Sequence, residues 1–306
     1  MALAIIYSRA CIGVESPQVT VEVHISNGMP GFCLVGLPET TVKESRDRVR
    51  SAIINSRFEF PAKRITVNLA PADLPKEGGR FDLPIALGIL IASEQIPSTS
   101  IEDKEFIGEL ALSGELRPVK GVLPAALAAN VAGRSLVVPK HNGDQAALVG
   151  REQHKSAQSL LEVCADLCGQ EPLNLYKSPK TLCQANLQRD LRDIIGQQQG
   201  KRALEIAAAG NHNLLFLGPP GTGKTMLASR LCDLLPEMSD QEALETASIA
   251  SLTQQEINHQ NWKHRPFRSP HHSSSMAALV GGGTVPRPGE ISLAHNGLLF
   301  LDEFRV

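Results

Sequence analysis

Eight residues, Gly218-Pro-Pro-Gly-Thr-Gly-Lys224-Thr225, have the types and spacing of a phosphate-binding loop. Glycines at 218, 221 and 223 let the backbone curl so that successive N–H groups point at phosphate oxygens. Lys224 would reach the β- and γ-phosphates of a nucleotide, and the Thr225 hydroxyl would bind Mg²⁺. The residues that we expect to contact the nucleotide are Gly218, Pro219, Pro220, Gly221, Thr222, Gly223, Lys224, Thr225 and Met226.

Two adjacent carboxylates follow an apolar run further along, in Gly297-Leu-Leu-Phe-Leu-Asp302-Glu303. Acidic residues after a strand are common in loops, but downstream of a phosphate-binding loop they have the pattern of a Walker B segment. Asp302 would hold Mg²⁺ directly or through water, and Glu303 would act as general base on the attacking water. The sequence therefore predicts Lys224 and Glu303 as catalytic residues, Thr225 and Asp302 as metal ligands, and ATP and Mg²⁺ as cofactors.

Strands and helices must position both motifs. The apolar run Asn213-Leu-Leu-Phe-Leu217 predicts a buried strand that delivers the loop, and Met226 to Leu235 predicts the helix that follows it. The other elements expected in this half are helices over 201–209 and 240–250, the second capped by Ser239, and exposed turns at 281–283, Pro286 and Pro288.

The first half alternates strand and helix signals. Val19-Thr-Val-Glu-Val-His-Ile25 places Val19, Val21, Val23 and Ile25 on one face, which predicts a half-buried strand. The further elements expected are a helix from Pro38 through Ser56 with the apolar stripe Val42, Val49, Ile53 and Ile54, a strand over 64–69, a helix capped by Asp82 and reaching about Glu94, a segment over 106–112, an alanine-rich helix after Pro124, a strand over 135–138 and a helix over 156–169.

The length of 306 residues suggests two domains, and the polar, proline-bearing stretch between the halves indicates a linker. We expect an α/β chain with domains at 1–170 and 187–306 joined by a linker at 171–186. Charged residues make up 20% of the chain and the net charge is -2, so any contact with nucleic acid must be a local patch.

The six cysteines are scattered without a C-x-x-C pair, which indicates a reduced interior. Cys164 and Cys168 share a helical face and are expected as core thiols. The N-terminus lacks the pattern of a signal peptide, and the longest apolar stretch, Leu83 to Ala92, is too short to span a bilayer. We therefore expect a soluble cytoplasmic protein with no membrane partner.

Five stretches, in this order, resemble the ComM/YifB family of magnesium-chelatase-like AAA+ ATPases. They are residues 37–52, 68–84, 218–225, 265–273 and 289–297, and the resemblance covers essentially all of 1–303. It implies a Lon-protease-like (ribosomal S5 domain 2-like) α+β domain followed by a P-loop AAA+ domain. It also implies a homo-hexameric ring motor that acts on DNA as a helicase in branch migration during natural transformation. The DNA role does not follow from composition.

The first domain resembles the proteolytic domain of Lon, which cleaves peptides with a Ser-Lys dyad. Pro75 to Gly79 resembles the loop before the Lon serine, yet Arg80 stands at the serine position. Similarly, Leu123 stands where the lysine is expected, and Lys120 is offset from it. Without a hydroxyl nucleophile and an amine of lowered pKa, acyl transfer has no route, so we expect a non-proteolytic scaffold.

Arg46, Arg48 and Arg50 allow two interpretations. They could contact phosphates, but their spacing spreads them around a helix and Glu44 and Asp47 lie beside them, which favours solvated ion pairs.

Two other stretches leave alternatives open. Trp262 to His272 mixes aromatic and basic residues, which suits gripping a single strand in a ring pore and equally suits an ordinary packed loop. Within it, the adjacent His271 and His272 point differently and make a poor metal pair. Asp193 to Gln197 resembles the segment near adenine in AAA+ proteins, or simply caps a helix.

The family pattern departs from this sequence after Glu303, which suggests a frameshift or a clipped chain. The sensor strand, arginine finger and helical lid of AAA+ proteins would all lie beyond Val306, so the AAA+ domain is expected to be incomplete. We therefore expect the first domain to fold, the ATPase half to be marginal, and the chain to bind ATP without efficient hydrolysis.

Two other functions stay open. A magnesium-chelatase ATPase subunit, which drives metal insertion into a porphyrin, is disfavoured by the extra Lon-like domain. A non-enzymatic nucleotide-binding or assembly module is the third possibility.

Overall fold

The computed structural model describes residues 2–36, 44–99, 101–149, 154–173, 175, 190–253, 263–283 and 287–302. The chain forms two compact units, Met1–Pro179 and Lys180–Val306. The division between them falls inside the predicted linker, most of which lies outside the described residues. The domain bounds at 170 and 187 stay predictions.

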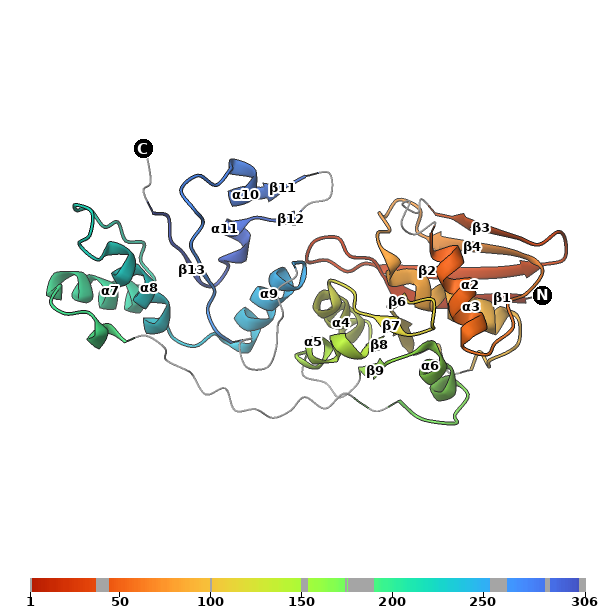
Figure 1. Ribbon diagram of the computed structural model, residues 1–306. Coiled ribbons are helices and arrows are strands. Elements are labelled where there is room, and N and C mark those ends of the chain that lie inside the picture. Colours follow the sequence, from red (N-terminus) through yellow and green to blue (C-terminus); the bar gives the residue numbers. More distant parts are fainter. Residues whose placement is uncertain are drawn as a thin grey trace. The chain divides into compact units, whose positions relative to one another are not determined.

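A seven-stranded mixed sheet organises the first unit, in the order β3-β4-β2-β1-β5-β8-β9 (Figure 1). Its strands are β1 Ala2–Arg9, β2 Gln18–Ser26, β3 Gly31–Val35, β4 Arg64–Ala70, β5 Lys104–Phe106, β8 Ser135–Pro139 and β9 Lys155–Ala157. The β1–β2 and β2–β4 pairs are antiparallel, whereas β3–β4, β1–β5, β5–β8 and β8–β9 are parallel. The predicted α/β class is confirmed.

The alternation over 19–25 is confirmed in β2, where Val19, Val21 and Val23 are fully buried. Leu69, Val67 and Ile65 of β4 lie opposite Val21, Val23 and Ile25 and share their buried face. Branched side chains directly opposite one another pack well on a pleated surface, so this pair of strands forms the floor of the core.

Helix α3, Asp82–Ala92, is buried along its whole length and packs on β1 and β2. Gly88 permits this approach, since a Cβ at that position would press on the side chain of Val23. Helix α2 (Ser45–Asn55) packs beside α3 on the same unit (Figure 1). The remaining elements of this unit are β6 Glu109–Leu110, β7 Leu116–Arg117, α4 Val122–Val131, α5 Gly143–Ala147, α6 Leu160–Leu167, and the 3₁₀ turns η1 Gly79–Phe81 and η2 Lys140–Asn142.

Two details predicted for α2 and α3 are wrong. Ile54 is 50% exposed, and Ala52 takes its place in the buried stripe with Val49 and Ile53. Asp82 does not cap α3, because its backbone is already helical and its carboxylate accepts from Arg48 instead. The part of the predicted helix over 38–43 lies outside the described residues.

Further corrections concern the later elements. The segment 106–112 splits into β5 and β6, because Gly108 turns to donate its N–H to the carbonyl of Arg80. The expected helix over 156–169 begins only at Leu160, where Ser159 accepts from the Glu162 N–H, while Ser156 belongs to β9.

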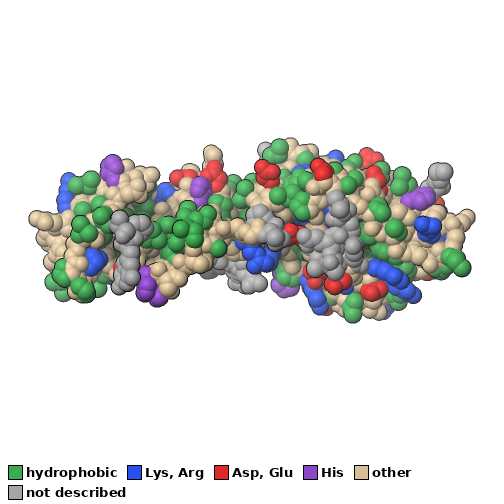
Figure 2. Space-filling view, turned by 90° about the horizontal axis from the view of Figure 1, so that it is seen from above, with side chains coloured by type: hydrophobic (Ala, Val, Ile, Leu, Met, Phe, Trp, Pro, Cys, Tyr) green, Lys and Arg blue, Asp and Glu red, His purple; other side chains and the backbone are tan. Residues whose placement is uncertain are grey.

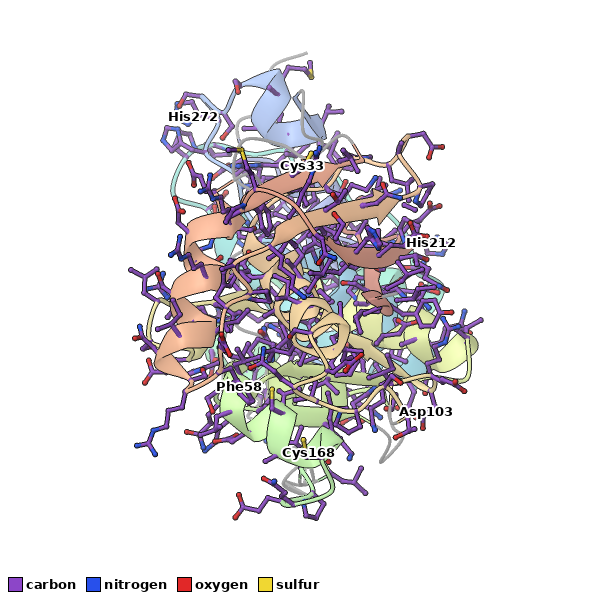
Figure 3. The ribbon with its side chains drawn as sticks, turned by 90° about the vertical axis from the view of Figure 1, so that its right-hand side faces the viewer. Cys33, Phe58, Asp103, Cys168, His212 and His272 are labelled. Atoms are coloured by element: carbon purple, nitrogen blue, oxygen red, sulfur yellow. The ribbon has the colours of Figure 1, made fainter. Side chains whose placement is uncertain are left out.

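Cys164 and Cys168, both expected on one buried helical face, differ in exposure. Cys164 is buried as expected, and burial raises the pKa of its thiol to about 12. Cys168 is exposed, so its assignment to the core is wrong. Figure 3 shows Cys168 beside α6 at the periphery of the unit. Cys168 comes just after α6, which ends at Leu167, and this places its thiol outside the packed face.

Short helices dominate the second unit. They are α7 Gln198–Gly210, α8 Lys224–Leu234, α9 Asp240–Ser251, α10 Met276–Val280, α11 Glu290–Leu293 and the 3₁₀ turn η3 Leu191–Asp193. Its strands are β10 Phe267–Arg268, β11 Gly281–Gly282, β12 Arg287–Pro288 and β13 Leu298–Leu299. The core is formed by Ile194, Leu204, Ala207, Leu227 and Leu231, where α7 packs on α8. The capping of α9 by Ser239 is confirmed.

The strand predicted over 213–217 is wrong. These residues are in no sheet, and Leu215 and Leu217 are 76% and 88% exposed. Only Phe216 packs against the core of the unit. A strand needs a neighbour to satisfy its N–H and C=O groups, and no described strand pairs with this run. The segment that leads into the loop over 218–225 is therefore exposed and is not a strand.

On the face drawn in Figure 2, acidic and basic side chains are interspersed rather than gathered by sign. Among the described residues, no helix combines the length and apolar character needed to span a lipid bilayer.

Candidate nucleotide site

The loop before α8 has the glycine conformations expected for a phosphate-binding turn. Gly221 and Gly223 have φ of 79° and 85°, in the left-handed region that favours glycine. A Cβ at either position would meet nothing within 4 Å, so the backbone conformation, not space, requires glycine there. The Thr222 hydroxyl donates to the Pro219 carbonyl at 2.9 Å and closes the turn.

The lysine of the motif lies against this turn. Helix α8 begins at Lys224, with Gly223 as its N-cap. Lys224 Nζ donates to the carbonyl oxygens of Gly218 and Pro219, both at 3.0 Å. A helix N-terminus with an adjacent ammonium group is suited to phosphate.

The structure brings the two predicted Mg²⁺ ligands together. Thr225 Oγ1 donates to Asp302 Oδ2 at 3.3 Å, and both side chains are exposed. One Mg²⁺ ion takes a hydroxyl and a carboxylate oxygen at about 2.1 Å each, so a single ion can bind both. Met226, in the first turn of α8, is 48% exposed and faces no core. Glu303 lies outside the described residues.

Strand pairing carries Asp302 to this place. Strand β13 pairs in parallel with β10, and the Phe300 N–H donates to the Arg268 carbonyl at 2.8 Å. Glycine is required at position 297, just before β13, because a Cβ there would collide with the Pro266 carbonyl. The rings of Phe267 and Phe300 stack with centroids 6.4 Å apart. The expected apolar strand is thus real but only partly buried and two residues long.

The segment over 193–197 has the capping contacts considered for it, and its place near adenine stays a prediction. Asp193 and Asp190 form a reciprocal capping box around η3, which is the capping alternative. However, Gln197 Nε2 also donates to the Thr222 carbonyl at 3.2 Å, and Ile195 beside it is 96% exposed. Residue types around Gln197 do not indicate this contact, because it depends on the fold of the loop.

The lysine and the two arginines of 263–268 have acidic partners. Lys263 Nζ lies 2.6 Å from Asp240, and Arg268 forms two hydrogen bonds with Glu290 at 2.6 and 2.7 Å. The Arg268 hydrogen bonds lower the pKa of Glu290. These contacts favour the packed-loop interpretation of the stretch, whose Trp262 lies outside the described residues.

His271 and His272 are exposed, with ring centroids 4.1 Å apart. Within the described part of the chain, no group of three or more His, Cys, Asp or Glu side chains could hold a metal ion. Among the residues that the structure describes, the zinc alternative therefore gains no support.

The arginines of α2 have partners within the first unit. Arg48 Nε lies 2.7 Å from Asp82, and Arg46 lies 3.9 Å from Asp47. The Arg50 guanidinium is 5.6 Å from the centroid of Phe60. Ion pairing therefore accounts for Arg46 and Arg48, and a cation–π contact for Arg50.

The positions compared with Lon hold no catalytic pair. Arg80 is 5% exposed, Leu123 is fully buried and Lys120 is exposed. Arg80 Nε and Nη2 are buried without an acceptor. A guanidinium and an alkyl chain supply neither a nucleophile nor its base.

Comparison with known proteins covers both units. A family model described as "Magnesium chelatase, subunit ChlI" matches residues 190–305, and one described as "Subunit ChlI of Mg-chelatase" matches residues 21–142. Competence protein ComM of Haemophilus influenzae is 64% identical over 307 residues, which is 99% of this chain and 60% of that protein. The protein YifB of Escherichia coli is 59% identical over 303 residues, with the same shares.

A more distant match concerns part of the chain. Lon protease 2 of Bacillus subtilis is 28% identical over 174 residues, which is 54% of this chain and 29% of that protease. The chain spans 60% of the length of the ComM and YifB relatives that it matches. On the strength of these matches and of the two models, the chain belongs to the ComM/YifB family of magnesium-chelatase-like proteins.

Proposed function

We propose that this chain binds ATP together with Mg²⁺ at the N-terminus of α8. The observation that carries the proposal is the 3.3 Å contact between Thr225 Oγ1 and Asp302 Oδ2, beside a glycine turn and Lys224. Backbone N–H groups of the turn would hold the phosphates, Lys224 would neutralise their charge, and Thr225 and Asp302 would share the metal.

We infer that this chain binds ATP but hydrolyses it inefficiently. Phosphoryl transfer depends mainly on fixed positions and charge stabilisation. The run 213–217 that leads into the loop is exposed and in no sheet, so the loop is held less firmly than a buried strand would hold it. Glu303 is the proposed general base for the turnover that remains.

Titration calorimetry with ATP tests the proposal. We expect wild-type chain to bind ATP, binding to tighten with Mg²⁺, and Lys224→Ala to weaken the affinity at least about tenfold, or about 1.4 kcal/mol. Lys140→Ala, an exposed lysine of the first unit, is the matched control and should bind as wild type does. A wild-type chain that binds no ATP would refute the proposal.

We further propose DNA as a partner and a homo-hexamer as the assembly, on the printed name of the Haemophilus relative, a competence protein, and on the family resemblance. The ion pairs of Lys263, Arg265 and Arg268 with acidic residues give this proposal no support. Anisotropy of a fluorescent single-stranded oligonucleotide, at two salt concentrations and with or without ATP, is the test. Binding that weakens steeply with salt is expected, and no binding at low salt contradicts it.

A further inference from the structure

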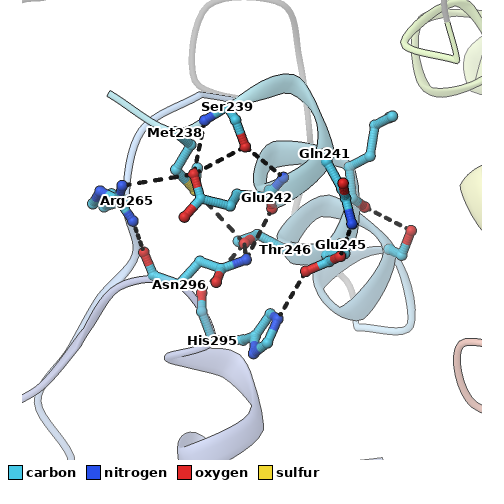
Figure 4. A network of polar contacts seen from close by, with 11 residues as sticks. Met238, Ser239, Gln241, Glu242, Glu245, Thr246, Arg265, His295 and Asn296 are labelled. Carbon is cyan, nitrogen blue, oxygen red and sulfur yellow. Dashed lines mark hydrogen bonds and ion pairs between the residues drawn. The ribbon is translucent and has the colours of Figure 1, made fainter. Parts of the chain in front are cut away.

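One guanidinium links the elements that carry the two predicted Mg²⁺ ligands. Arg265 Nε donates to the carbonyl of Pro236, just after α8, at 2.7 Å. Its Nη1 donates to the carbonyl of Asn296, just before β13, also at 2.7 Å. Nη2 lies 3.8 Å from Glu242 Oε2 (Figure 4), and the Arg265 side chain is only 14% exposed.

The backbone at this position is held by the same two elements. The Cys232 thiol of α8 donates to the Arg265 carbonyl at 3.2 Å. Burial raises the pKa of Cys232 to about 11, which keeps the thiol protonated as a donor. The next carbonyl, that of Pro266, accepts from the Leu298 N–H at 2.8 Å. Residues 265 and 266 therefore join α8 to β13 through main chain as well as side chain.

Helix α9 fixes Asn296 from the other side. Asn296 Nδ2 donates to the Glu242 carbonyl at 3.1 Å and to Thr246 Oγ1 at 3.3 Å. Asn296 has φ of 56°, a left-handed conformation that needs such support in a residue other than glycine. The Glu242 carboxylate also accepts from the N–H and hydroxyl of Ser239 (Figure 4), so it is held where it faces Arg265.

This link is at the opposite end of both elements from the nucleotide site. Thr225 is in the first turn of α8 and Pro236 follows its end; likewise Asp302 follows β13 and Asn296 precedes it. A slip of one residue in a strand moves every side chain by about 3.3 Å. Metal–oxygen distances of about 2.1 Å tolerate no such displacement.

We propose that Arg265 is a positioning residue of the nucleotide site. By bonding the carbonyls of Pro236 and Asn296 at once, it fixes the strand of Asp302 on the helix of Thr225 and so sets how strongly Mg²⁺ tightens ATP binding. The inference rests on the proposed function of the site.

The test compares ATP affinity in Mg²⁺ and in EDTA for Arg265→Lys and Arg265→Gln. Neither side chain can donate to both carbonyls and face Glu242 as the forked guanidinium does. We expect the affinity in EDTA to stay within about twofold of wild type and the gain from Mg²⁺ to fall about tenfold. Adding Arg265→Lys to Asp302→Asn should not lower the gain in ATP affinity from Mg²⁺ any further, since both substitutions act on the same Mg²⁺ ligand.

Arg202→Lys, an exposed arginine of α7 paired with Glu205, is the matched control and should keep the full gain. Arg265→Lys with a wild-type gain from Mg²⁺ would overturn the inference. An equal loss in Mg²⁺ and in EDTA would also overturn it, because that pattern means general destabilisation. If wild-type chain binds ATP with a clear gain from Mg²⁺, the proposed function stands whatever the Arg265 variants do. If it binds none, both fail.

Discussion

The Thr225 hydroxyl and the Asp302 carboxylate are 3.3 Å apart, although 77 residues separate them in the chain. The contact does not depend on a strand before the loop, since β13 pairs with β10 and no described strand pairs with 213–217. Helix α8 positions one ligand and the β10–β13 pair positions the other.

Asp302→Asn should therefore weaken the binding of Mg²⁺ and leave the binding of the phosphates unchanged. The amide keeps the shape of the carboxylate but loses its charge, so we expect the affinity for ATP in Mg²⁺ to fall about tenfold and the affinity in EDTA to stay unchanged. Thr225→Ser, which keeps the hydroxyl, is the control and should bind as wild type does. Equal affinities of Asp302→Asn and wild type in Mg²⁺ would remove Asp302 from the site.

Local features of this site were predictable from sequence, and contacts between distant segments were not. The glycine turn and the start of α8 near Lys224 follow from residue types a few positions apart. The run 213–217 has the composition of a strand, but pairing depends on a neighbour that its own residues cannot specify. The composition around Arg265 suits a binding loop and a packed loop equally, because nothing in its vicinity indicates Pro236 and Asn296 as its acceptors.

The ion pair between half-buried Arg48 and buried Asp82 gives a prediction for the first unit. Asp82 is fully buried and accepts from Arg48 at 2.7 and 3.2 Å and from the Leu110 N–H at 3.3 Å. Arg48→Met leaves this carboxylate without its cation, so the free energy of unfolding should fall by about 3–5 kcal/mol. Hydrogen exchange of peptides from α3 and β4 in increasing urea measures the loss.

The double variant Arg48→Met/Asp82→Leu distinguishes the cause. It removes both charges, so it should recover most of the stability lost in Arg48→Met. If the double variant is as unstable as the single one, lost packing by the arginine stem, and not the unpaired carboxylate, accounts for the effect.

His154 should make the first unit less stable in mild acid. It is 3% exposed, its Nδ1 accepts from the Leu136 N–H at 3.1 Å, and burial lowers its pKa while Glu105 opposes the shift. Because the folded pKa is below the unfolded one, its contribution is complete above about 6.5 and is lost as pH falls further. One proton changes the free energy of unfolding by at most about 1.4 kcal/mol per pH unit.

His154→Gln isolates this contribution. The glutamine oxygen can accept from the Leu136 N–H and does not titrate, so its stability should change less than that of wild type between neutral pH and mild acid. Urea unfolding followed by hydrogen exchange of β8 peptides compares the two. Parallel curves for wild type and variant would assign the acid sensitivity to other groups.

The buried guanidinium of Arg80 should lower the free energy of unfolding of the first unit. Two of its nitrogens are buried without an acceptor, and burial lowers the pKa of Arg80, with the Cys11 thiol opposing the shift. Replacing a buried, poorly compensated ion by an apolar group of similar length is often neutral or stabilising by about 1–4 kcal/mol. Arg80→Met should thus unfold at the same urea concentration as wild type or at a higher one. Arg80→Ala opens a cavity, so it should not be more stable than wild type. Arg80→Ser should acquire no peptidase activity, since Leu123 offers no amine to activate the hydroxyl. A loss of stability in Arg80→Met beyond about 1 kcal/mol would mean that the guanidinium has a partner in solution whose contribution exceeds the cost of burying the charge.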